Sequence, residues 1–95
     1  MERGHLGVIL ATAGASQGDE GWSNLPEGKF LTLHAAHNGV GLTIGRGVAV
    51  RTEGSLIFLR TMKGETFVLD INDVFAGAVD GTAPASARTA GFIQR

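Results

Sequence analysis

The sequence contains no cysteine among its 95 residues. This absence excludes disulfides, thiolate zinc sites and thiol nucleophiles, and it is typical of a reducing compartment, so we expect a cytoplasmic protein. An excess of charge of either sign is also missing, because eight Lys and Arg against nine Asp and Glu give a formal net charge of -1. Without a basic run the chain lacks the electrostatic footprint of nonspecific nucleic-acid binding, and nucleic acid is disfavoured as a partner.

Long apolar runs are missing as well, since none approaches the ~18 residues that a membrane-spanning helix needs. We therefore expect no contact with a membrane. Residues 6–15, LGVILATAGA, resemble a short signal-peptide core, but the residues before them include Glu2 beside Arg3 and no cluster of positive charge. We interpret this stretch as the first strand, with secretion as the less favoured alternative.

Apolar residues and glycines dominate what is present. Hydrophobic residues make up 43% of the chain and charged residues only 18%, with fifteen glycines against two prolines. The length predicts a single domain over residues 1–95, and the low charge suggests that part of its surface is an interface. Short apolar runs between Gly-containing dipeptides are typical of an all-β chain. We expect a long Gly-rich loop at 14–28 and a flexible segment at 81–91.

The dipeptide Asn38-Gly39 suits a two-residue type I′ hairpin turn. It predicts that His37 faces Val40, and further pairs follow in the same register: Ala36 with Gly41, Ala35 with Leu42, His34 with Thr43, Leu33 with Ile44, Thr32 with Gly45, Leu31 with Arg46 and Phe30 with Gly47. One face of this hairpin is aliphatic and the other small or polar, as expected for a hairpin that covers a core on one side. The alternative is a helix near residues 25–38 that ends at Asn38-Gly39.

Two further turns are predicted at Glu53-Gly54 and Lys63-Gly64. The first sets Arg51 opposite Leu56 and Val50 opposite Ile57, and the second sets Arg60 opposite Phe67 and Leu59 opposite Val68. The strand between them, residues 55–62, is apolar on both faces, so we expect both faces to be covered. The candidates to cover the second face are the first strand, the C-terminal segment or another copy of the chain. The glycines of residues 45–47, GRG, predict a bend or bulge in the preceding strand.

The fold predicted from these features is an all-β, mostly antiparallel meander of six or seven strands in a closed or half-open barrel; an α+β fold with one helix near 25–38 is the alternative. The order of strands and tight turns, with a late DINDV turn at residues 70–74, is similar to the small SH3-like and Sm-like barrels. No site residue and no function is carried over from this resemblance, since a shared fold does not establish function.

The two histidines of HAAHNGVG, His34 and His37, are the most obvious candidates for chemistry. On a strand their odd spacing sends the side chains to opposite faces, whereas on a helix a spacing of three would allow a shared metal ion. Because the hairpin is favoured, we predict no metal site and no cofactor. Either histidine is a candidate for contact with a ligand or partner.

The other candidate contact residues are aromatic or basic. Arg51, Arg60 and Lys63 with Phe58 and Phe67 would form a small basic and aromatic surface, although arginine stems commonly pack on sheet aromatics without binding anything. Trp22, the only tryptophan, either anchors the 14–28 loop or contacts a partner.

These features identify no activity. The leading hypothesis is a nonenzymatic β module that forms a homo-oligomer and binds a protein partner or small ligand at the interface. The second is an Sm-like or SH3-like binder of RNA or peptide. The third and weakest is a small enzyme that uses His34 or His37 as its titrating group.

Overall fold

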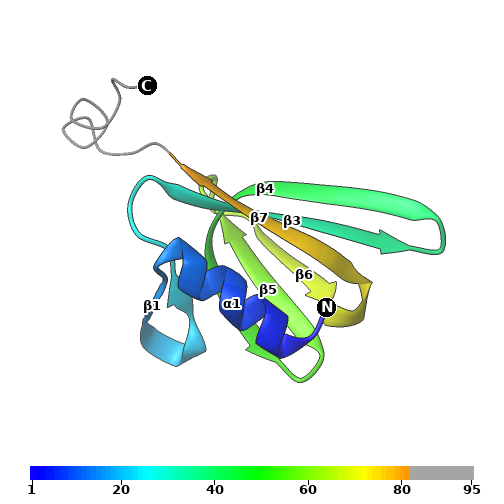
Figure 1. Ribbon diagram of the computed structural model, residues 1–95, viewed down its shortest axis with the longest axis horizontal. Coiled ribbons are helices and arrows are strands. Elements are labelled where there is room, and N and C mark those ends of the chain that lie inside the picture. Colours follow the sequence, from blue (N-terminus) through cyan, green and yellow to red (C-terminus); the bar gives the residue numbers. More distant parts are fainter. Residues whose placement is uncertain (82–95) are drawn as a thin grey trace.

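The computed structural model describes residues 1–81. A single sheet of antiparallel strands curls into a half-barrel, and one helix lies across it (Figure 1). The elements in chain order are α1 (Arg3–Ala13), β1 (Ser16–Gln17), the 3-10 turn η1 (Asp19–Gly21), β2 (Ser23–Asn24), β3 (Lys29–His37), β4 (Val40–Glu53), β5 (Leu56–Thr61), β6 (Thr66–Asp70), the 3-10 turn η2 (Ile71–Asp73) and β7 (Val74–Gly81). The mostly antiparallel all-β meander is therefore confirmed. The alternative helix near 25–38 is wrong, because that stretch contains β3.

The order of strands leaves the sheet open. Its neighbours run β1-β2-β4-β3-β7, while β5 pairs with β4 and β6. Within residues 1–81, β6 pairs only with β5 and β7 pairs only with β3, so each has one edge without a strand partner. The half-open form of the predicted barrel is the one observed.

The β3–β4 hairpin has the predicted turn. Asn38 and Gly39 both have positive φ, 52° and 82°, as a type I′ turn requires. The predicted partners are confirmed from the turn as far as the pair of Leu33 and Ile44. Beyond it the register changes, and Leu31 lies opposite Gly47 rather than Arg46.

The change of register is the bulge that the GRG sequence predicts. Arg46 has a φ of 62°, so one extra residue is accommodated in β4 at this point. Before the bulge β4 pairs with β3, and beyond it β4 continues alongside β5. A Cβ atom on Gly47 would lie 2.9 Å from the carbonyl oxygen of Leu31, so only glycine fits where the strands cross over. This bend gives the sheet its curl.

The two later hairpins differ from prediction in their register. The turn between β4 and β5 is Gly54-Ser55, which places Glu53 opposite Leu56 and Arg51 opposite Phe58. This shift of two residues leaves each side chain on its predicted face. The turn before β6 has three residues, closed by a hydrogen bond from the Thr61 amide to the Glu65 carbonyl, with Gly64 at a φ of 89°.

The three-residue turn shifts the register of β6 by one residue. Leu59 lies opposite Phe67 rather than Val68, and Arg60 lies opposite Thr66 rather than Phe67. Shifting a strand by one residue exchanges its two faces. Phe67 therefore belongs to the core side of the sheet and not to the surface that carries Arg60.

The stretch 6–15 was expected as a strand, and that prediction is wrong. It forms α1, which ends at Gly14 in the left-handed conformation with hydrogen bonds back to Ala11 and Leu10. Leu6, Ile9 and Ala13 recur at helical spacing and are buried. No helix within residues 1–81 is long and apolar enough to cross a membrane.

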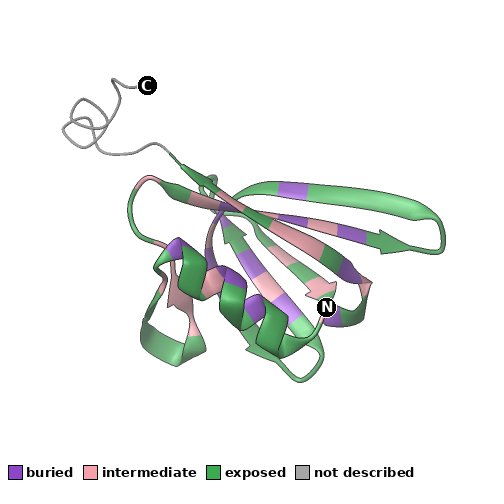
Figure 2. Ribbon diagram, viewed as in Figure 1, coloured by how far each residue is buried: buried purple, intermediate pink, exposed green. Residues whose placement is uncertain are grey.

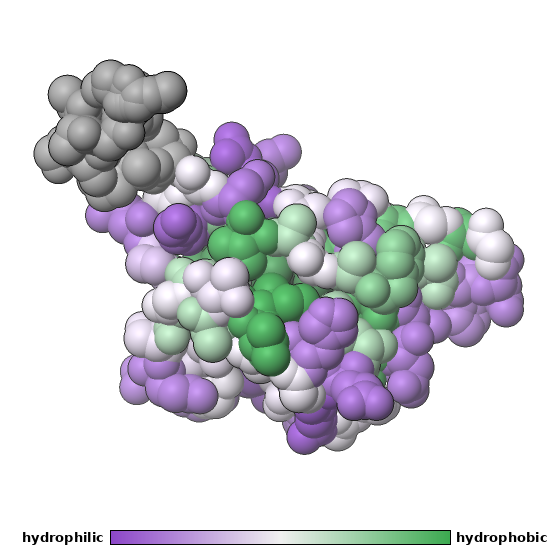
Figure 3. All heavy atoms as spheres, viewed as in Figure 1, coloured by the Kyte–Doolittle hydropathy of each residue, from purple (hydrophilic) through white to green (hydrophobic). Residues whose placement is uncertain are grey.

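The helix α1 packs against β7 at Gly77, where the absence of a side chain leaves space for it. The Ile9 side chain packs closely against Gly77 of β7. A Cβ atom added to Gly77 would lie only 2.8 Å from Cδ1 of Ile9. Figure 3 shows hydrophobic residues gathered over the region of α1, and Val8, on the outer side of the helix, is 64% exposed. One turn of the helix thus contributes both to the core and to the surface.

The segment 14–28 was expected to be a loop. It contains the short strands β1 and β2, and β2 pairs with β4 through Ser23 opposite Val50. The segment is thus a ribbon added to the sheet. The flexible segment predicted at 81–91 lies, apart from Gly81, outside the described residues.

The core lies between the curled sheet and α1 (Figure 2). Ile57 and Leu59 of β5 are fully buried, as expected for one face of this strand. The other face is only partly covered within residues 1–81, since Leu56 is 40% and Met62 63% exposed while Phe58 is half-buried. The first strand that was one candidate to cover this face is instead α1, which packs on the core side. The C-terminal segment lies outside the described residues, so coverage by it or by a second copy of the chain stays a prediction.

The burial of Leu6 gives a direct test of α1. We expect Leu6→Ala to lower the free energy of unfolding by about 2–5 kcal/mol, because it removes a core side chain that is 2% exposed. Val8→Ala, in the same helix but exposed, should change it by no more than about 0.5 kcal/mol. Urea denaturation of both variants measures the difference, and equal effects would contradict this placement of the helix.

Candidate functional site

The structure keeps the two candidate histidines apart. Nδ1 of His34 lies 3.1 Å from Oγ1 of Thr43 on the neighbouring strand, and its ring lies 6.2 Å from that of Phe75. Nδ1 of His37 lies 2.9 Å from the Asp73 carboxylate of η2. Each histidine therefore has its own partner, and within residues 1–81 no group of three or more His, Cys, Asp or Glu side chains could hold a metal ion.

The contact between His37 and Asp73 joins the tip of the β3–β4 hairpin to the turn before β7. The hydrogen bond and the charge of Asp73 raise the pKa of His37 above its ordinary value of 6.5, and the charge of Asp70 adds to this, while a small loss of hydration opposes it. The imidazolium form is favoured because it donates to a carboxylate. The pair therefore depends on pH near neutrality.

Four of the other candidate residues form a stack on the outer face of the sheet. The guanidinium carbon of Arg51 lies 4.1 Å from the centre of the Phe58 ring and 5.6 Å from that of Trp22. The guanidinium carbon of Arg60 lies 4.1 Å from the centre of the Trp22 ring. We call Phe58, Arg51, Trp22 and Arg60 the cation–π stack.

The contacts of the cation–π stack explain how the 16–24 ribbon is held on β4 and β5. Arg51 also forms an ion pair of 3.1 Å with Glu53, and Asp19 and Glu20 line a shallow cleft beside Arg60. Each guanidinium thus has a stacking partner, and acidic groups surround them. Phe67, the remaining candidate, lies away from the stack because of the register of β6.

Phe67 instead lines a groove on the open side of the half-barrel, which consists of two adjoining clefts that share Leu42. We call the first, of about 450 Å³, the His37 cleft; it is lined by Ala35, Ala36, His37, Asn38, Val40, Leu42, Leu69 and Asp73. We call the second, of about 290 Å³, the Thr61 cleft; it is lined by Leu42, Thr43, Ile44, Gly45, Arg46, Thr61, Lys63, Glu65 and Phe67.

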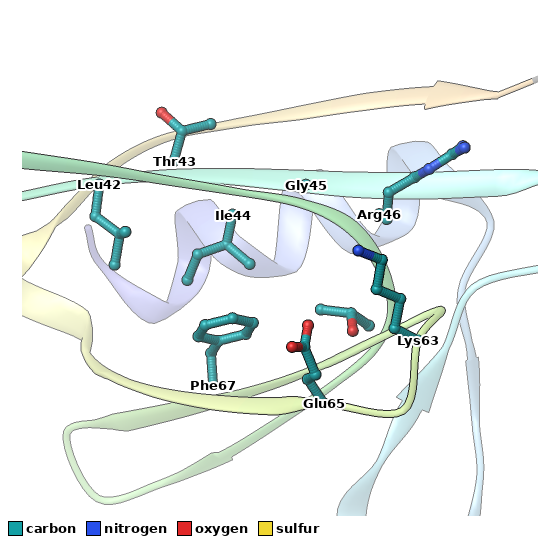
Figure 4. Close-up of a pocket in the computed structure, with 9 residues that line it drawn as sticks. Leu42, Thr43, Ile44, Gly45, Arg46, Lys63, Glu65 and Phe67 are labelled. Atoms are coloured by element: carbon teal, nitrogen blue, oxygen red, sulfur yellow. The ribbon is translucent and has the colours of Figure 1, made fainter.

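The Thr61 cleft has an apolar wall and a polar end. Leu42 and Ile44 point down from β4 towards the Phe67 ring, and Lys63 and Glu65 extend from the turn and the start of β6 towards β4 (Figure 4). The Arg46 side chain points away from the cleft in Figure 4, and its guanidinium carbon lies 4.9 Å from the Phe30 ring centre. The charged groups that extend into the cleft are thus Lys63 and Glu65.

Thr61 is the buried polar residue of this cleft. Its side chain belongs to a residue only 5% exposed, and its hydroxyl has no hydrogen-bond partner within the described part of the chain. Its backbone is fully used, since the amide donates to Glu65 and the carbonyl accepts from Gly64. A buried hydroxyl without a partner costs about 1–3 kcal/mol, so a polar atom placed beside it would be stabilising.

Sequence reasoning assigned Lys63 to the basic and aromatic surface and gave no site role to Thr61, Glu65 or Asp73. The Lys63-Gly64 turn was recognised, but its three-residue form, which aims Lys63 and Glu65 towards β4, was not. Asp73 was interpreted only as part of the DINDV turn at residues 70–74. No local signal marks the Thr61 hydroxyl, because its isolation depends on the packing of β4 against the turn.

Comparison with known proteins adds nothing to these observations, because no protein-family model, no curated protein and no solved structure matches the chain. Function therefore has to be argued from the geometry alone.

The His37–Asp73 pair predicts a pH-dependent coupling. Because the pKa of His37 is raised in the folded state, the pair contributes its full stability below about pH 6.5 and loses it as the pH rises through the raised pKa. We expect the coupling in a double-mutant cycle of His37→Gln and Asp73→Asn to be favourable at about pH 5.5 and clearly weaker at about pH 9. Thermal unfolding measures it, and a coupling independent of pH would contradict the assignment.

Proposed function

We propose that the protein is a nonenzymatic β module that assembles with copies of itself through the open edges of its sheet and presents a ligand or partner site beside the interface. The observation that carries the proposal is the pair of open edges. β6 and β7 each lack a strand partner on one side within residues 1–81. Unpaired edges are templates for pairing with another chain.

The surface beside these edges supports the proposal. Val68 on β6 is 52% exposed and Phe75 on β7 is 64% exposed. The described part of β6 carries neither proline nor lysine, which are residues that proteins use to block edge pairing. Addition of a strand would satisfy backbone groups and remove apolar side chains from water in the same contact.

A second copy of the chain is the occupant that fits best. Within residues 1–81 the open edges of β6 and β7 belong to longer strands than that of β1, which has two residues, so the β6 edge of one copy can pair with the β7 edge of the next. Such a head-to-tail interface is heterologous, and it closes into a ring or continues as a filament. The low charge of the surface removes most of the repulsion between identical copies.

Lysine substitutions on the two edge strands β6 and β7 test this proposal. We expect the wild-type chain to exceed its monomer mass of 9.9 kDa in light scattering, and Val68→Lys or Phe75→Lys to reduce it to monomer. Val8→Lys is the matched control, because Val8 is as exposed as Phe75 but lies on the outer side of α1 rather than on an edge strand. A wild-type chain that stays monomeric at millimolar concentration would contradict the proposal.

A mixture of the two edge variants tests the head-to-tail geometry. In a mixture, the intact β7 edge of Val68→Lys can still pair with the intact β6 edge of Phe75→Lys. We therefore expect two variants that are monomeric alone to form a 1:1 dimer together. A symmetric interface of one edge with itself would instead leave one of the variants dimeric without its partner.

Binding of RNA or peptide is the second candidate function, and the cation–π stack is the observation that favours it. The exposed guanidinium of Arg60 on Trp22 is a surface on which a base could stack. The acidic residues beside it, Asp19 and Glu20, argue against a polyanion. Affinity for single-stranded RNA that falls steeply with added salt and is lost in Arg60→Gln would favour this function over assembly alone.

A further inference from the structure

We propose that the Thr61 cleft is a binding site for a small zwitterion with an apolar body, an α-amino acid with an aliphatic side chain. Three observations point to this class of ligand: a buried hydroxyl without a partner, an apolar wall, and two opposite charges that both face the space and do not pair with each other. The inference does not rest on self-assembly, because all the residues of the cleft come from one chain.

The first observation shows that the cleft needs a polar atom at its inner end. The Thr61 hydroxyl can both donate and accept a hydrogen bond, and no described residue offers it a partner. The surrounding backbone is already committed to the turn, through the amide of Thr61 and the bond from Met62 to the carbonyl of Arg46. Because these backbone groups are used in the turn, a molecule bound in the cleft can supply the partner that this hydroxyl lacks.

The second observation limits the size and the body of the ligand. The cleft holds about 290 Å³, just under the ~300–1,000 Å³ of sites for drug-sized molecules. The side chains that face each other across it are aliphatic or aromatic: Ile44 and Leu42 from β4 and Phe67 from β6 (Figure 4). A small molecule with a short aliphatic group fits this wall.

The third observation selects the charges of the ligand. Lys63 and Glu65 both extend towards β4, and within residues 1–81 neither forms an ion pair. A ligand with only a carboxylate would be attracted by Lys63 but repelled by Glu65. A ligand with only an ammonium group would be attracted by Glu65 but repelled by Lys63. A zwitterion places its carboxylate at Lys63 and its ammonium at Glu65, so both charges gain a partner.

Binding of L-leucine by the full chain tests the proposal. L-leucine is compared with 4-methylpentanoate, which lacks the ammonium, and with 3-methylbutylamine, which lacks the carboxylate. In an amide-resolved NMR titration we expect millimolar L-leucine to shift the signals of residues 42–46 and 61–67. Each analogue should bind at least about tenfold more weakly, since each loses one charge-assisted hydrogen bond.

Substitutions of the two charged residues should change specificity in opposite directions. Glu65→Gln should make L-leucine and 4-methylpentanoate bind equally, and Lys63→Gln should do the same for L-leucine and 3-methylbutylamine. Glu27→Gln and Lys29→Gln change the same residue types outside the cleft and should leave the preferences as in the wild type. A merely structural role of Lys63 or Glu65 would not produce this exchange.

Thr61→Val tests the hydroxyl. It keeps the shape of the side chain and should weaken L-leucine binding about five- to tenfold while leaving the protein folded, because it removes a buried polar group that lacks a partner. Thr66→Val, on the neighbouring strand with an exposed side chain, is the matched control. Unchanged affinity in Thr61→Val would overturn the assignment of the hydroxyl.

Two further results would overturn the whole proposal. One is the absence of shifts in the cleft at millimolar L-leucine, which would mean that water alone fills it. The other is binding of all three compounds with equal affinity. Repeating the titration on Val68→Lys separates this site from assembly, since we expect the monomeric variant to bind L-leucine as the wild type does.

Discussion

The bend of β4 is the constraint on which the other features of the structure depend. β4 pairs with β3 before residues 45–47 and with β5 after them, so one strand belongs to both halves of the sheet. The bulge at Arg46 and the close approach of Leu31 and Leu59 at Gly47 turn the sheet by local backbone geometry. The bend also places Thr61 opposite Gly47. The cleft and the curl of the sheet thus have the same origin.

A sheet that curls but does not close can bury a core on its concave side and still leave room for a groove. The curl gives Ile57, Leu59 and the residues of β3 a concave side in which to be buried, with α1 added as a cover. Closure would pair the edges of β6 and β7 and leave less room for the groove between β4 and β6. A chain this short buries little surface by itself, so open edges and exposed apolar side chains are available for contacts with other molecules.

Sequence patterns predicted the features that local chemistry determines. Asn38-Gly39 specified the β3–β4 hairpin because two positive φ angles suit few other dipeptides, and the GRG sequence located the bend. The predicted register of β6 was wrong because Lys63-Gly64 fits a two-residue and a three-residue turn equally well. A difference of one residue in the turn decides on which face of the sheet Phe67 lies. The prediction of a strand at residues 6–15, where the structure has α1, was wrong because an apolar run of this length is compatible with both a strand and a helix.

The candidate site was harder to predict than the fold, for a physical reason. Trp22, Arg51, Phe58 and Arg60 do come together, but their contacts with one another account for the ribbon that they hold. Thr61 was not noticed, since a threonine near the end of a strand is ordinary in sequence. Its importance arises only when β4 and the β5–β6 turn enclose its hydroxyl, and such an arrangement involves residues far apart in the chain.

The position of Trp22 between two guanidinium groups determines what optical methods can see in this protein. As the only tryptophan in the chain, it is responsible for most of the intrinsic ultraviolet fluorescence. Its surroundings are the ribbon of residues 16–24 and the outer face of β4 and β5, and the buried core contributes nothing to them. Emission from this chain therefore reports how the ribbon is seated, whereas circular dichroism reports the sheet beneath it, and the two signals describe separate parts of one molecule.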